Sequence, residues 1–107
     1  MITIDDFSKI EIRVGLVKEA INKEGSEKLI RLTVDFGDET KTIFTGVRSY
    51  GFTPEDFAGK KFLFVTNLEY KKMMDEESQG MILAVDGAEG KPVFINADGL
   101  DIGSKVR

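Results

Sequence analysis

The sequence predicts an all-β domain: a five-stranded barrel with a short helix between the third and fourth strands and a C-terminal extension of short strands. Three observations carry this prediction. Apolar and polar residues alternate along the first half of the chain, as they do in half-buried strands. A brief helix signal at residues 53–59 separates this half from later apolar runs. The 11 glycines are spread along the chain and mark turns between strands.

The first predicted strand begins near Ile10, after Asp5 and Asp6, which can cap a short helical turn. Its two faces are Ile10, Ile12, Val14 and Leu16 on one side and Glu11, Arg13, Gly15 and Val17 on the other. This alternation predicts a long, half-buried strand. A glycine in mid-strand, at Gly15, predicts a bulge or a sharp coil, which small barrels need.

The next two strands form a predicted hairpin over residues 29–47. Apolar residues alternate with polar ones up to a turn at Gly37-Asp38, after which the chain returns. The alternating set is Ile30, Leu32, Val34 and Phe36. Residues 53–59 then predict the short helix, because a threonine stands at the N-cap, a proline follows it, and a glycine ends the segment.

Two apolar runs follow the helix, at residues 60–68 and 80–87, and each predicts a buried strand. Residues 91–99 and 102–106 predict two short further strands. The polar stretch between the two runs, residues 67–81, carries lysines, methionines and three consecutive acids. It is either a solvated loop or the working edge of the protein.

Five strands with a helix between the third and the fourth are the layout of an OB-fold barrel. An SH3-like barrel is the alternative, but the position of the helix favours the OB-fold. We expect one domain over residues 1–107, with the barrel at about 9–86 and a C-terminal extension at 87–107. OB barrels leave one face open for ligands, often nucleic acid or oligosaccharide, although a fold alone does not establish a function.

Composition narrows the classes of function. The 107 residues contain no cysteine and no histidine, which excludes disulfides, thiolate metal sites and a Ser-His-Asp arrangement, so neither catalysis nor a cofactor is expected. No apolar run has the length of a membrane helix and the N-terminus lacks a signal peptide, which indicates a cytoplasmic protein. The net charge of −4 argues weakly against nucleic acid, but attraction is local over a Debye length of about 10 Å.

A metal site made only of carboxylates is the remaining alternative for catalysis. Acids gather at residues 5–6, 38–39 and 75–77, each time in a predicted turn. Consecutive carboxylates rarely converge on one ion, and runs of charge are usually solvated, so solvated acidic tips are the preferred interpretation. Calcium-loop and P-loop patterns are not matched, which leaves metal binding and nucleotide hydrolysis without support.

Basic residues can gather on one side of the predicted barrel. Arg13 and Arg31 fall on outward faces, Lys28 and Lys41 begin the second and third strands, and Lys71 and Lys72 end the fourth. A phosphate backbone would be held there by charge. An evenly mixed, solvated surface is the alternative that composition alone leaves open.

Apolar residues beside these cations favour the first interpretation. Leu29 points outward by strand parity, and Met73 and Met74 lie in the polar stretch. Exposed apolar groups next to cations suit a platform for unstacked bases. The alternative for the methionines is that they fill gaps at the mouth of the barrel.

Five segments together resemble a known family. They are DFSKIEIRVGLVKEA, GSEKLIRLTVDFG, IFTGVRS, GKKFLFVTNLEYKKM and SQGMILA. In this order and spacing they resemble the OB-fold tRNA-binding domain over nearly the whole chain. That family includes the C-terminal domain of bacterial methionyl-tRNA synthetase, a free-standing β subunit of that enzyme, small structure-specific tRNA-binding proteins, an export-chaperone-like dimer and a cytokine module. The synthetase branch is the most similar.

The resemblance implies non-sequence-specific tRNA binding as an auxiliary domain or subunit of methionyl-tRNA synthetase. The chain itself would not be an enzyme; it would assist the catalytic part of the synthetase. The resemblance also implies a homodimer, built partly from the chain end that follows the barrel. The alternative within the family is a free-standing structure-specific or chaperone-like protein, which would use Leu29 and Met73 to bind peptides.

Eight positions match the family's binding residues: Arg13, Lys28, Leu29, Asn67, Lys72, Met73, Ser78 and Met81. The resemblance implies that the cations meet phosphates, that the polar side chains bond base edges or a 2′-OH, and that the apolar ones contact bases. Lys41 and Lys71 join this list from their positions alone.

Two features depart from the family pattern. Gln79 stands where a glutamate is usual; it keeps the hydrogen-bond acceptor and adds a donor, but it cannot form a salt bridge. Residues 75–77 are all acidic, where the family's loop is commonly basic. Three carboxylates there would repel phosphate, so we expect their neutralisation to strengthen tRNA binding if this edge is the site.

Overall fold

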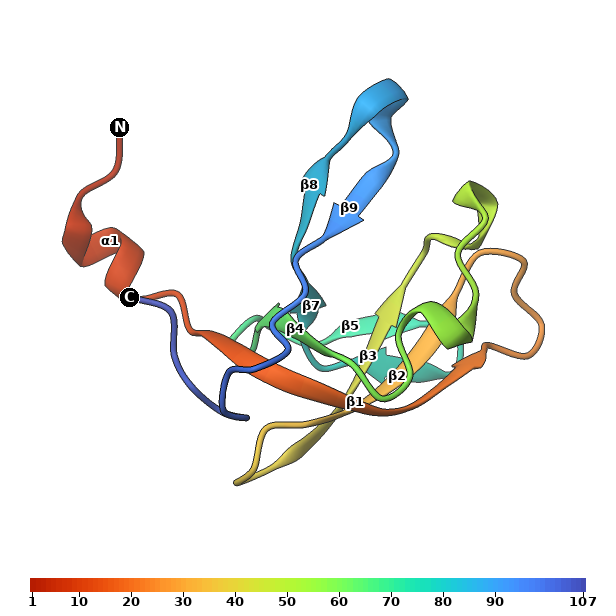
Figure 1. Ribbon diagram of the computed structural model, residues 1–107, viewed down its shortest axis with the longest axis horizontal. Coiled ribbons are helices and arrows are strands. Elements are labelled where there is room, and N and C mark those ends of the chain that lie inside the picture. The colour runs from red at the N-terminus through yellow and green to blue at the C-terminus, as the bar shows by residue number, and fades with distance from the viewer.

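The computed structural model describes residues 1–107 and contains a five-stranded antiparallel sheet that curls into a nearly closed barrel (Figure 1). In the order β3-β2-β1-β4-β7, the strands are β3 Thr40–Thr45, β2 Ile30–Asp35, β1 Ile12–Asn22, β4 Lys61–Val65 and β7 Met81–Ile82. The amide of Gln79 donates to the carbonyl of Thr42 at 2.8 Å, which helps to close the barrel beside β3. The predicted all-β, five-stranded barrel is therefore confirmed.

Shorter elements surround the barrel. They are α1 Ile4–Ser8, η1 Arg48–Tyr50, η2 Pro54–Asp56, β5 Lys71–Met73, β6 Glu76–Ser78, β8 Ala84–Asp86, η3 Ala88–Gly90 and β9 Pro92–Phe94. The pairs β5–β6 and β8–β9 are two-stranded hairpins outside the main sheet. In Figure 1, α1 lies at the left beside the C-terminus, whereas the β8–β9 hairpin rises from the middle of the view. None of the helices is long and apolar enough to pass through a membrane.

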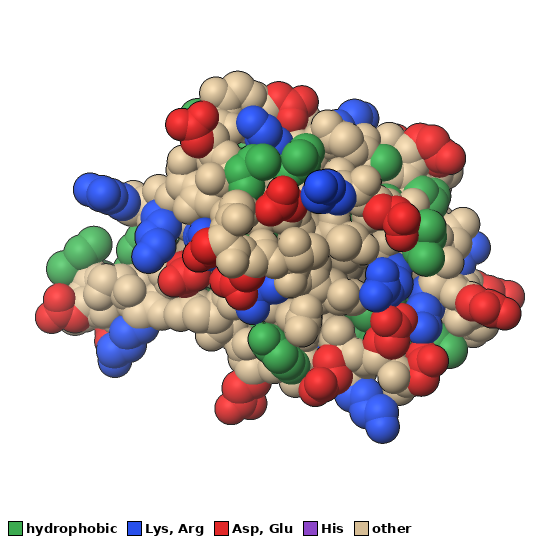
Figure 2. All heavy atoms as spheres, turned by 90° about the horizontal axis from the view of Figure 1, so that it is seen from below, with side chains coloured by type: hydrophobic (Ala, Val, Ile, Leu, Met, Phe, Trp, Pro, Cys, Tyr) green, Lys and Arg blue, Asp and Glu red, His purple; other side chains and the backbone are tan.

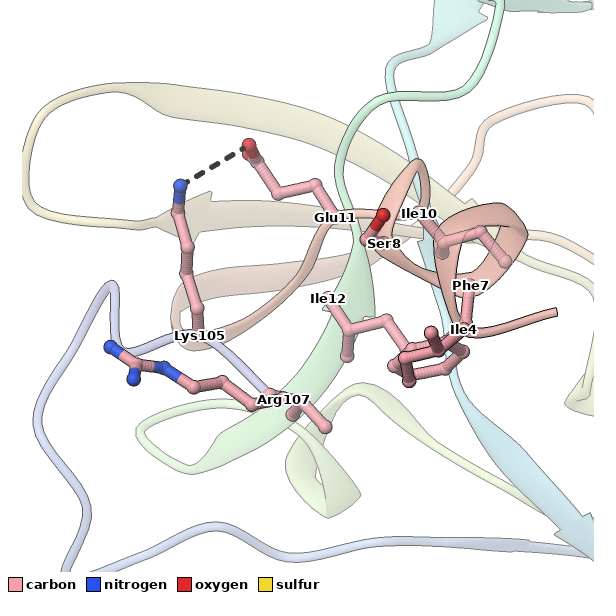
Figure 3. A pocket seen from close by; sticks show the side chains of 9 residues that line it. Ile4, Phe7, Ser8, Ile10, Glu11, Ile12, Lys105 and Arg107 are labelled. Carbon is pink, nitrogen blue, oxygen red and sulfur yellow. Dashed lines mark ion pairs between the residues drawn. The ribbon is translucent and has the colours of Figure 1, made fainter.

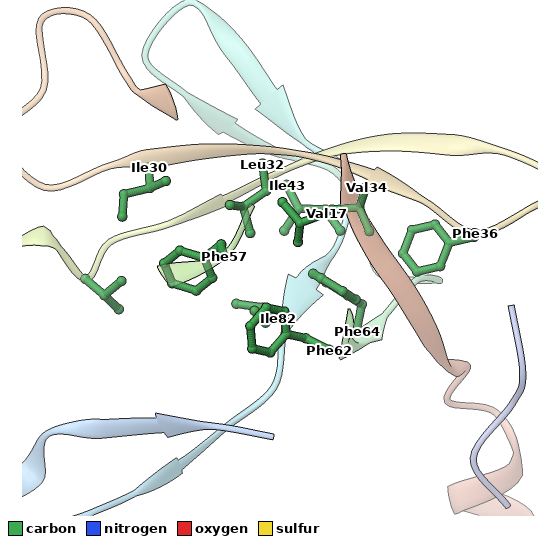
Figure 4. Close-up of a cluster of buried hydrophobic side chains, with 11 residues drawn as sticks. Val17, Ile30, Leu32, Val34, Phe36, Ile43, Phe57, Phe62, Phe64 and Ile82 are labelled. Carbon is green, nitrogen blue, oxygen red and sulfur yellow. The ribbon is translucent and has the colours of Figure 1, made fainter. Parts of the chain in front are cut away.

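Eleven buried apolar side chains fill the barrel (Figure 4). Ile30, Leu32 and Val34 of β2 all point into it, as their alternation predicts. Burying one such side chain stabilises the fold by roughly 1.5–3 kcal/mol relative to leaving it exposed. A register slip of one residue would turn all three outward, so this core fixes how β2 pairs with its neighbours.

β1 packs on the core with the face opposite to the one its alternation suggests. Val17 is fully buried among the core residues, and a Cβ on Gly15 would lie 2.5 Å from a core valine. Gly15 therefore allows the neighbouring side chains to pack closely against β1. The bulge predicted at Gly15 is found further along the strand, where the register shifts between Val17 and Glu19. Val14, on the other face, is also buried, where its backbone pairs with residues 103 and 104. With apolar residues on both faces, alternation cannot say which one faces inward.

Three predicted segments are shorter than expected. The strand predicted at 80–87 is divided: β7 stays beside β4, whereas β8 leaves the barrel to pair with β9. The helix predicted at 53–59 is a single 3₁₀ turn, closed by reciprocal hydrogen bonds between Thr53 and Asp56. The strand predicted at 102–106 is reduced to one bridge with β1. In each case too few residues find a backbone partner to extend the element.

Candidate functional site

Two loops reach toward each other over the outer side of the barrel. The 23–29 loop joins β1 to β2, and the β5–β6 hairpin, residues 71–78, lies between β4 and β7. The ammonium of Lys23 in the loop lies 2.7 Å from a carboxylate oxygen of Asp75 and 2.6 Å from one of Glu76. Further contacts to β2 and β3 place the hairpin over their outer faces, the surface that OB barrels use for ligands.

The base of the hairpin is fixed to β3 by side chains as well as backbone. Ser78 is 4% exposed; its hydroxyl accepts from the amide of Phe44 at 3.0 Å and donates to the carbonyl of Gly80 at 3.0 Å. The side-chain oxygen of Gln79 accepts from the amide of Thr42 at 2.8 Å. Only an acceptor is needed at this position, so glutamine serves here without any salt bridge.

The acidic tip of the hairpin is ion-paired rather than merely solvated. Glu76 contacts Lys23 with one carboxylate oxygen and, at 3.0 Å, Arg31 with the other. Hydrogen bonds from Lys23 lower the pKa of Asp75, and those from Lys23 and Arg31 lower the pKa of Glu76. Bonds to these two acids raise the pKa of Lys23 in turn. Glu77 is exposed and makes no ion pair, so the three acids of the tip are not equivalent.

Besides Arg31, two more of the basic residues singled out in the sequence are paired within the chain, and both of these are buried. Arg13, expected to face outward, is 7% exposed and donates to Asp38 at 2.8 Å and to the carbonyl of Phe36 at 3.2 Å. Its hydrogen bond holds the pKa of the Asp38 carboxyl below the usual range. Lys41 is also buried, and it shares Glu39 with Arg13, at 3.4 and 3.3 Å respectively. The acids at 38–39 therefore balance buried cations instead of forming a free acidic tip.

Asn67 ties the start of β1 to the end of β4. Its side-chain oxygen accepts from the amide of Glu11 at 2.8 Å, and its side-chain nitrogen donates to the carbonyl of Lys9 at 2.7 Å. Beside it, the hydroxyl of Thr66 donates to the Glu11 carboxylate at 2.6 Å, and this bond is the main reason that the pKa of Glu11 is lowered. The side chains of Asn67 and Ser78 therefore form hydrogen bonds that stabilise the fold.

The remaining predicted residues lie at or near the surface around the two loops. Three lysines are exposed and have no ion-pair partner: Lys28 in the 23–29 loop, and Lys71 and Lys72 in β5. Leu29 and Met73 are half-buried. The structure therefore places three free cations on the two elements that border the outer faces of β2 and β3.

An apolar groove of about 590 Å³ runs beside the hairpin. Its lining includes Lys71, Met73, Ser78 and Met81 from the predicted set, together with Phe44 and Leu68. Sequence reasoning missed the last two. Leu68 is 45% exposed just after a buried strand, a position where an apolar residue could have been noticed. Phe44 gave no signal, because it directly follows the core residue Ile43 in β3 and its sequence position does not show which face it occupies.

Acidic and basic side chains are mixed on the surface of the barrel and do not form separate positive and negative patches. Figure 2 shows acidic and basic side chains interspersed over the face of the molecule seen from below. No three carboxylates lie close enough together to hold a metal ion. Any attraction for an anion must therefore be local, at places where cations lack an acidic neighbour.

A second candidate surface lies at the two chain ends. We call it the chain-end surface: Ile4, Phe7, Ile10, Ile12 and Val106, which line a pocket between α1 and the C-terminal residues (Figure 3). No residue of α1 is buried, and Ile4 is 78% exposed. An ion pair between Lys105 and Glu11, at 3.7 Å, lies at its margin. This surface is apolar, in contrast to the two loops.

Comparison with known sequences gives consistent results. A family model described as a putative tRNA-binding domain matches residues 12–104. The chain is 43% identical over 106 residues to a methionine–tRNA ligase of Caldanaerobacter subterraneus and 38% identical over 107 residues to one of Acidithiobacillus ferrooxidans. These matches cover 98% and 99% of this chain but only 16% of each relative.

Solved structures similar to this chain extend the comparison. A methionyl-tRNA-synthetase-related protein from Pyrococcus horikoshii superposes with a TM-score of 0.93 at 41% identity, covering 100% of this chain and 98% of that one. The CsaA chaperone of Picrophilus torridus superposes with a TM-score of 0.87 at 29% identity and covers 100% of both chains. The CsaA chaperone of Bacillus anthracis gives 0.87 at 27% identity, covering 100% of this chain and 99% of that one.

Proposed function

Because the chain belongs to the family of putative tRNA-binding domains, we propose that it binds tRNA across the outer faces of β2 and β3, between the 23–29 loop and the β5–β6 hairpin. One observation carries the placement. The unpaired cations Lys28, Lys71 and Lys72 border the same face as the apolar groove beside the hairpin. Cations for phosphates next to an apolar platform for bases are what binding of unstacked nucleic acid requires.

Roles within this surface divide between contact and support. Lys28, Lys71 and Lys72 meet phosphates, and Met73 and Met81 offer apolar contact to bases in the groove. Leu29 extends that contact from the loop. Four of the predicted residues support the surface without contacting the RNA, because their polar groups already bond within the chain. They are Arg13, Lys41, Asn67 and Ser78. With few base-reading groups exposed, recognition is dominated by phosphates and is not sequence-specific.

We propose that the chain works as an auxiliary domain or subunit of methionyl-tRNA synthetase in the cytoplasm. The curated relatives are methionine–tRNA ligases, of whose length this chain spans 16%. A second, weak contact tethered to a catalytic part raises the overall affinity for tRNA through effective concentration. The chain itself performs no chemistry, since it offers no histidine or cysteine and no cluster of three carboxylates.

We further propose that two copies associate through the chain-end surface, with the 87–107 extension taking part. Apolar residues that are more than half exposed include Ile2, two positions before α1, Ile4 in α1, and Val85 and Val93 in the β8–β9 hairpin. Monomeric proteins rarely leave apolar groups gathered on one face without a partner. A homodimer would cover them and would present two tRNA surfaces on one particle.

A second candidate function is the binding of unfolded peptides. It is favoured by the likeness to two CsaA chaperones over the whole chain and by the net charge of −4, which does not attract RNA at long range. The apolar groove beside the hairpin would then take apolar side chains of the peptide. This alternative predicts binding that is indifferent to salt, since apolar burial involves no counterions.

The deciding experiment measures binding of an unmodified tRNA at several salt concentrations. The tRNA hypothesis expects log K to fall linearly with log[salt], with a slope of about −0.7 to −0.9 for each phosphate contacted. Different tRNAs should give similar affinities. If no tRNA binding is detectable at low salt, while the protein suppresses aggregation of a denatured protein, the peptide-binding alternative replaces our proposal.

A further inference from the structure

Lys23 and Arg31 hold one carboxylate between them. Lys23 Nζ lies 2.6 Å from Glu76 Oε2, and Arg31 Nε lies 3.0 Å from Glu76 Oε1. Asp75 adds a second carboxylate to Lys23, at 2.7 Å. All of these acids come from the tip of the β5–β6 hairpin, whereas the two cations come from the β1–β2 side. The contacts therefore join two elements separated by more than forty residues of sequence.

Both cations also contact groups other than the carboxylates. The other guanidinium nitrogens of Arg31 donate to hydroxyls of Thr33 on β2 and Thr42 on β3, at 3.3 and 3.4 Å. The ammonium of Lys23 lies 5.9 Å from the centre of the Phe44 ring, and only 11% of its side chain is exposed. Both positively charged groups thus lie on the outer faces of the strands, preorganised beneath the tip of the hairpin.

An anion with several oxygens fits this arrangement as well as a carboxylate does. Guanidinium and ammonium groups bind carboxylate and phosphate oxygens with the same donors. Charges on the exposed face of a protein are screened by water and salt, so Asp75, with 79% of its side chain exposed, is readily displaced. The hairpin is anchored at its other end by Ser78 and Gln79, so the tip can move while the base stays on β3.

We propose that Lys23 and Arg31 form a phosphate-binding site for RNA, which the carboxylate of Glu76 occupies in the free protein and which a backbone phosphate takes when RNA binds. This inference rests on the proposed tRNA binding and adds two contacts to it, at positions that the family resemblance does not include. It also accounts for an acidic tip beside a surface that binds a polyanion. The acids compete with phosphate for Lys23 and Arg31 and so lower the affinity for RNA.

The matched pair Glu76→Gln and Glu77→Gln tests this site. Both substitutions remove one negative charge from the same strand, but only Glu76 occupies the cations, while Glu77 is exposed and unpaired. Affinity for tRNA should rise about five-fold at 0.1 M salt in Glu76→Gln, because the incoming phosphate no longer has to displace a carboxylate from the two cations. The slope of log K against log[salt] should also steepen in this variant, because the carboxylate released in the wild type takes up a counterion and the glutamine does not. In Glu77→Gln the slope should not change.

A second set of variants separates release of the cations from loosening of the hairpin. Lys23→Gln breaks the contacts of Lys23 with Asp75 and Glu76 but removes a cation, so it should not tighten binding. Arg31→Gln should remove the gain when it is combined with Glu76→Gln and have a smaller effect in the wild type, where the site is already filled. The amide signals of Ser78 and Gln79, followed by NMR, report in every variant whether the base of the hairpin is still in place.

The outcomes distinguish this inference from the function on which it rests. If the wild type binds tRNA and the two glutamine variants behave alike, the phosphate site is wrong and the proposed function stands. A gain in Glu76→Gln that survives the addition of Arg31→Gln also overturns the site. If neither the wild type nor Glu76→Gln binds tRNA at 50 mM salt, both proposals fail together.

Discussion

The β5–β6 hairpin and the chain-end surface both project beyond the core, yet their chemistry is opposite. The hairpin tip carries charged groups in ion pairs with the 23–29 loop and β2, beside three unpaired lysines. The chain-end surface is apolar, with a five-residue helix that buries nothing. Ionic contacts weaken as salt is added, whereas burial of apolar surface does not. The first surface therefore suits a polyanion and the second a protein, and salt should separate the two.

The largest effect is expected at the chain-end surface. Substituting both Ile4 and Val106 with aspartate should raise the dissociation constant of the dimer at least about 100-fold, because burying unpaired charges in an apolar interface is strongly unfavourable. Sedimentation equilibrium measures this directly. Tyr50→Asp is the control, since Tyr50 is 47% exposed and lies in η1, which is not part of the chain-end surface. A wild type that sediments as an 11.9 kDa monomer at micromolar concentration contradicts the dimer.

The next effect concerns the anchoring of the hairpin. Ser78→Ala should lower the free energy of unfolding by about 1–3 kcal/mol, because the amide of Phe44 is left buried without its acceptor. Urea unfolding measures the loss. Ser49→Ala, at an exposed position in η1, should change stability by less than about 0.5 kcal/mol. Equal stability of the two variants would mean that the Ser78 hydroxyl contributes nothing to anchoring the hairpin.

A smaller effect is expected from a single free cation. Lys72→Glu should weaken tRNA binding about ten-fold at low salt, since one phosphate contact is lost and one repulsion is gained. Dimerisation should be unaffected, which keeps the two surfaces distinct. Lys60→Glu changes the net charge equally, but Lys60 lies at the junction of η2 and β4, away from the hairpin. Comparable losses in both variants would show that only the total charge matters.

The barrel itself could be predicted because its signals are local. Ile30, Leu32 and Val34 alternate with polar residues over one strand, and their inward face follows from a period of two. The inward face of β1 could not be read in the same way. Val14 and Val17 are both buried, since the C-terminal residues cover one side of β1 while the core covers the other.

The candidate site could be predicted only in part, because the state of a charged side chain depends on partners far away in sequence. Lys72 was expected to meet phosphates, and the fold leaves it exposed, but nothing near Arg13 in the sequence shows that Asp38 and Glu39 will enclose it. The pairing of Lys23 with Glu76 spans 53 residues and is equally invisible. Sequence therefore indicated a candidate stretch, while the fold decides which of its charges remain available.

The last prediction uses acid to compare the two surfaces. Contacts in the folded protein lower the pKa values of Glu76, on the hairpin side, and Glu11, at the margin of the chain-end surface. A carboxyl whose pKa is lower in the folded state stabilises the fold above its unfolded pKa, near 4, and this contribution is lost as the pH falls below that value. The melting temperature of the wild type should therefore decline between about pH 5 and pH 3.

Glu76→Gln and Glu11→Gln each remove one of these titrating groups, so each variant should have a shallower decline than the wild type over the same range. Glu77→Gln should follow the wild-type curve, because Glu77 has no cationic partner to lose. Circular dichroism melts at five or six pH values are sufficient. If Glu11→Gln flattens the curve and Glu76→Gln does not, the ion pairs of the hairpin tip contribute nothing to the stability of the free protein. The tip would then be held only by its anchored base, and Lys23 and Arg31 would already be open to solvent before RNA arrives.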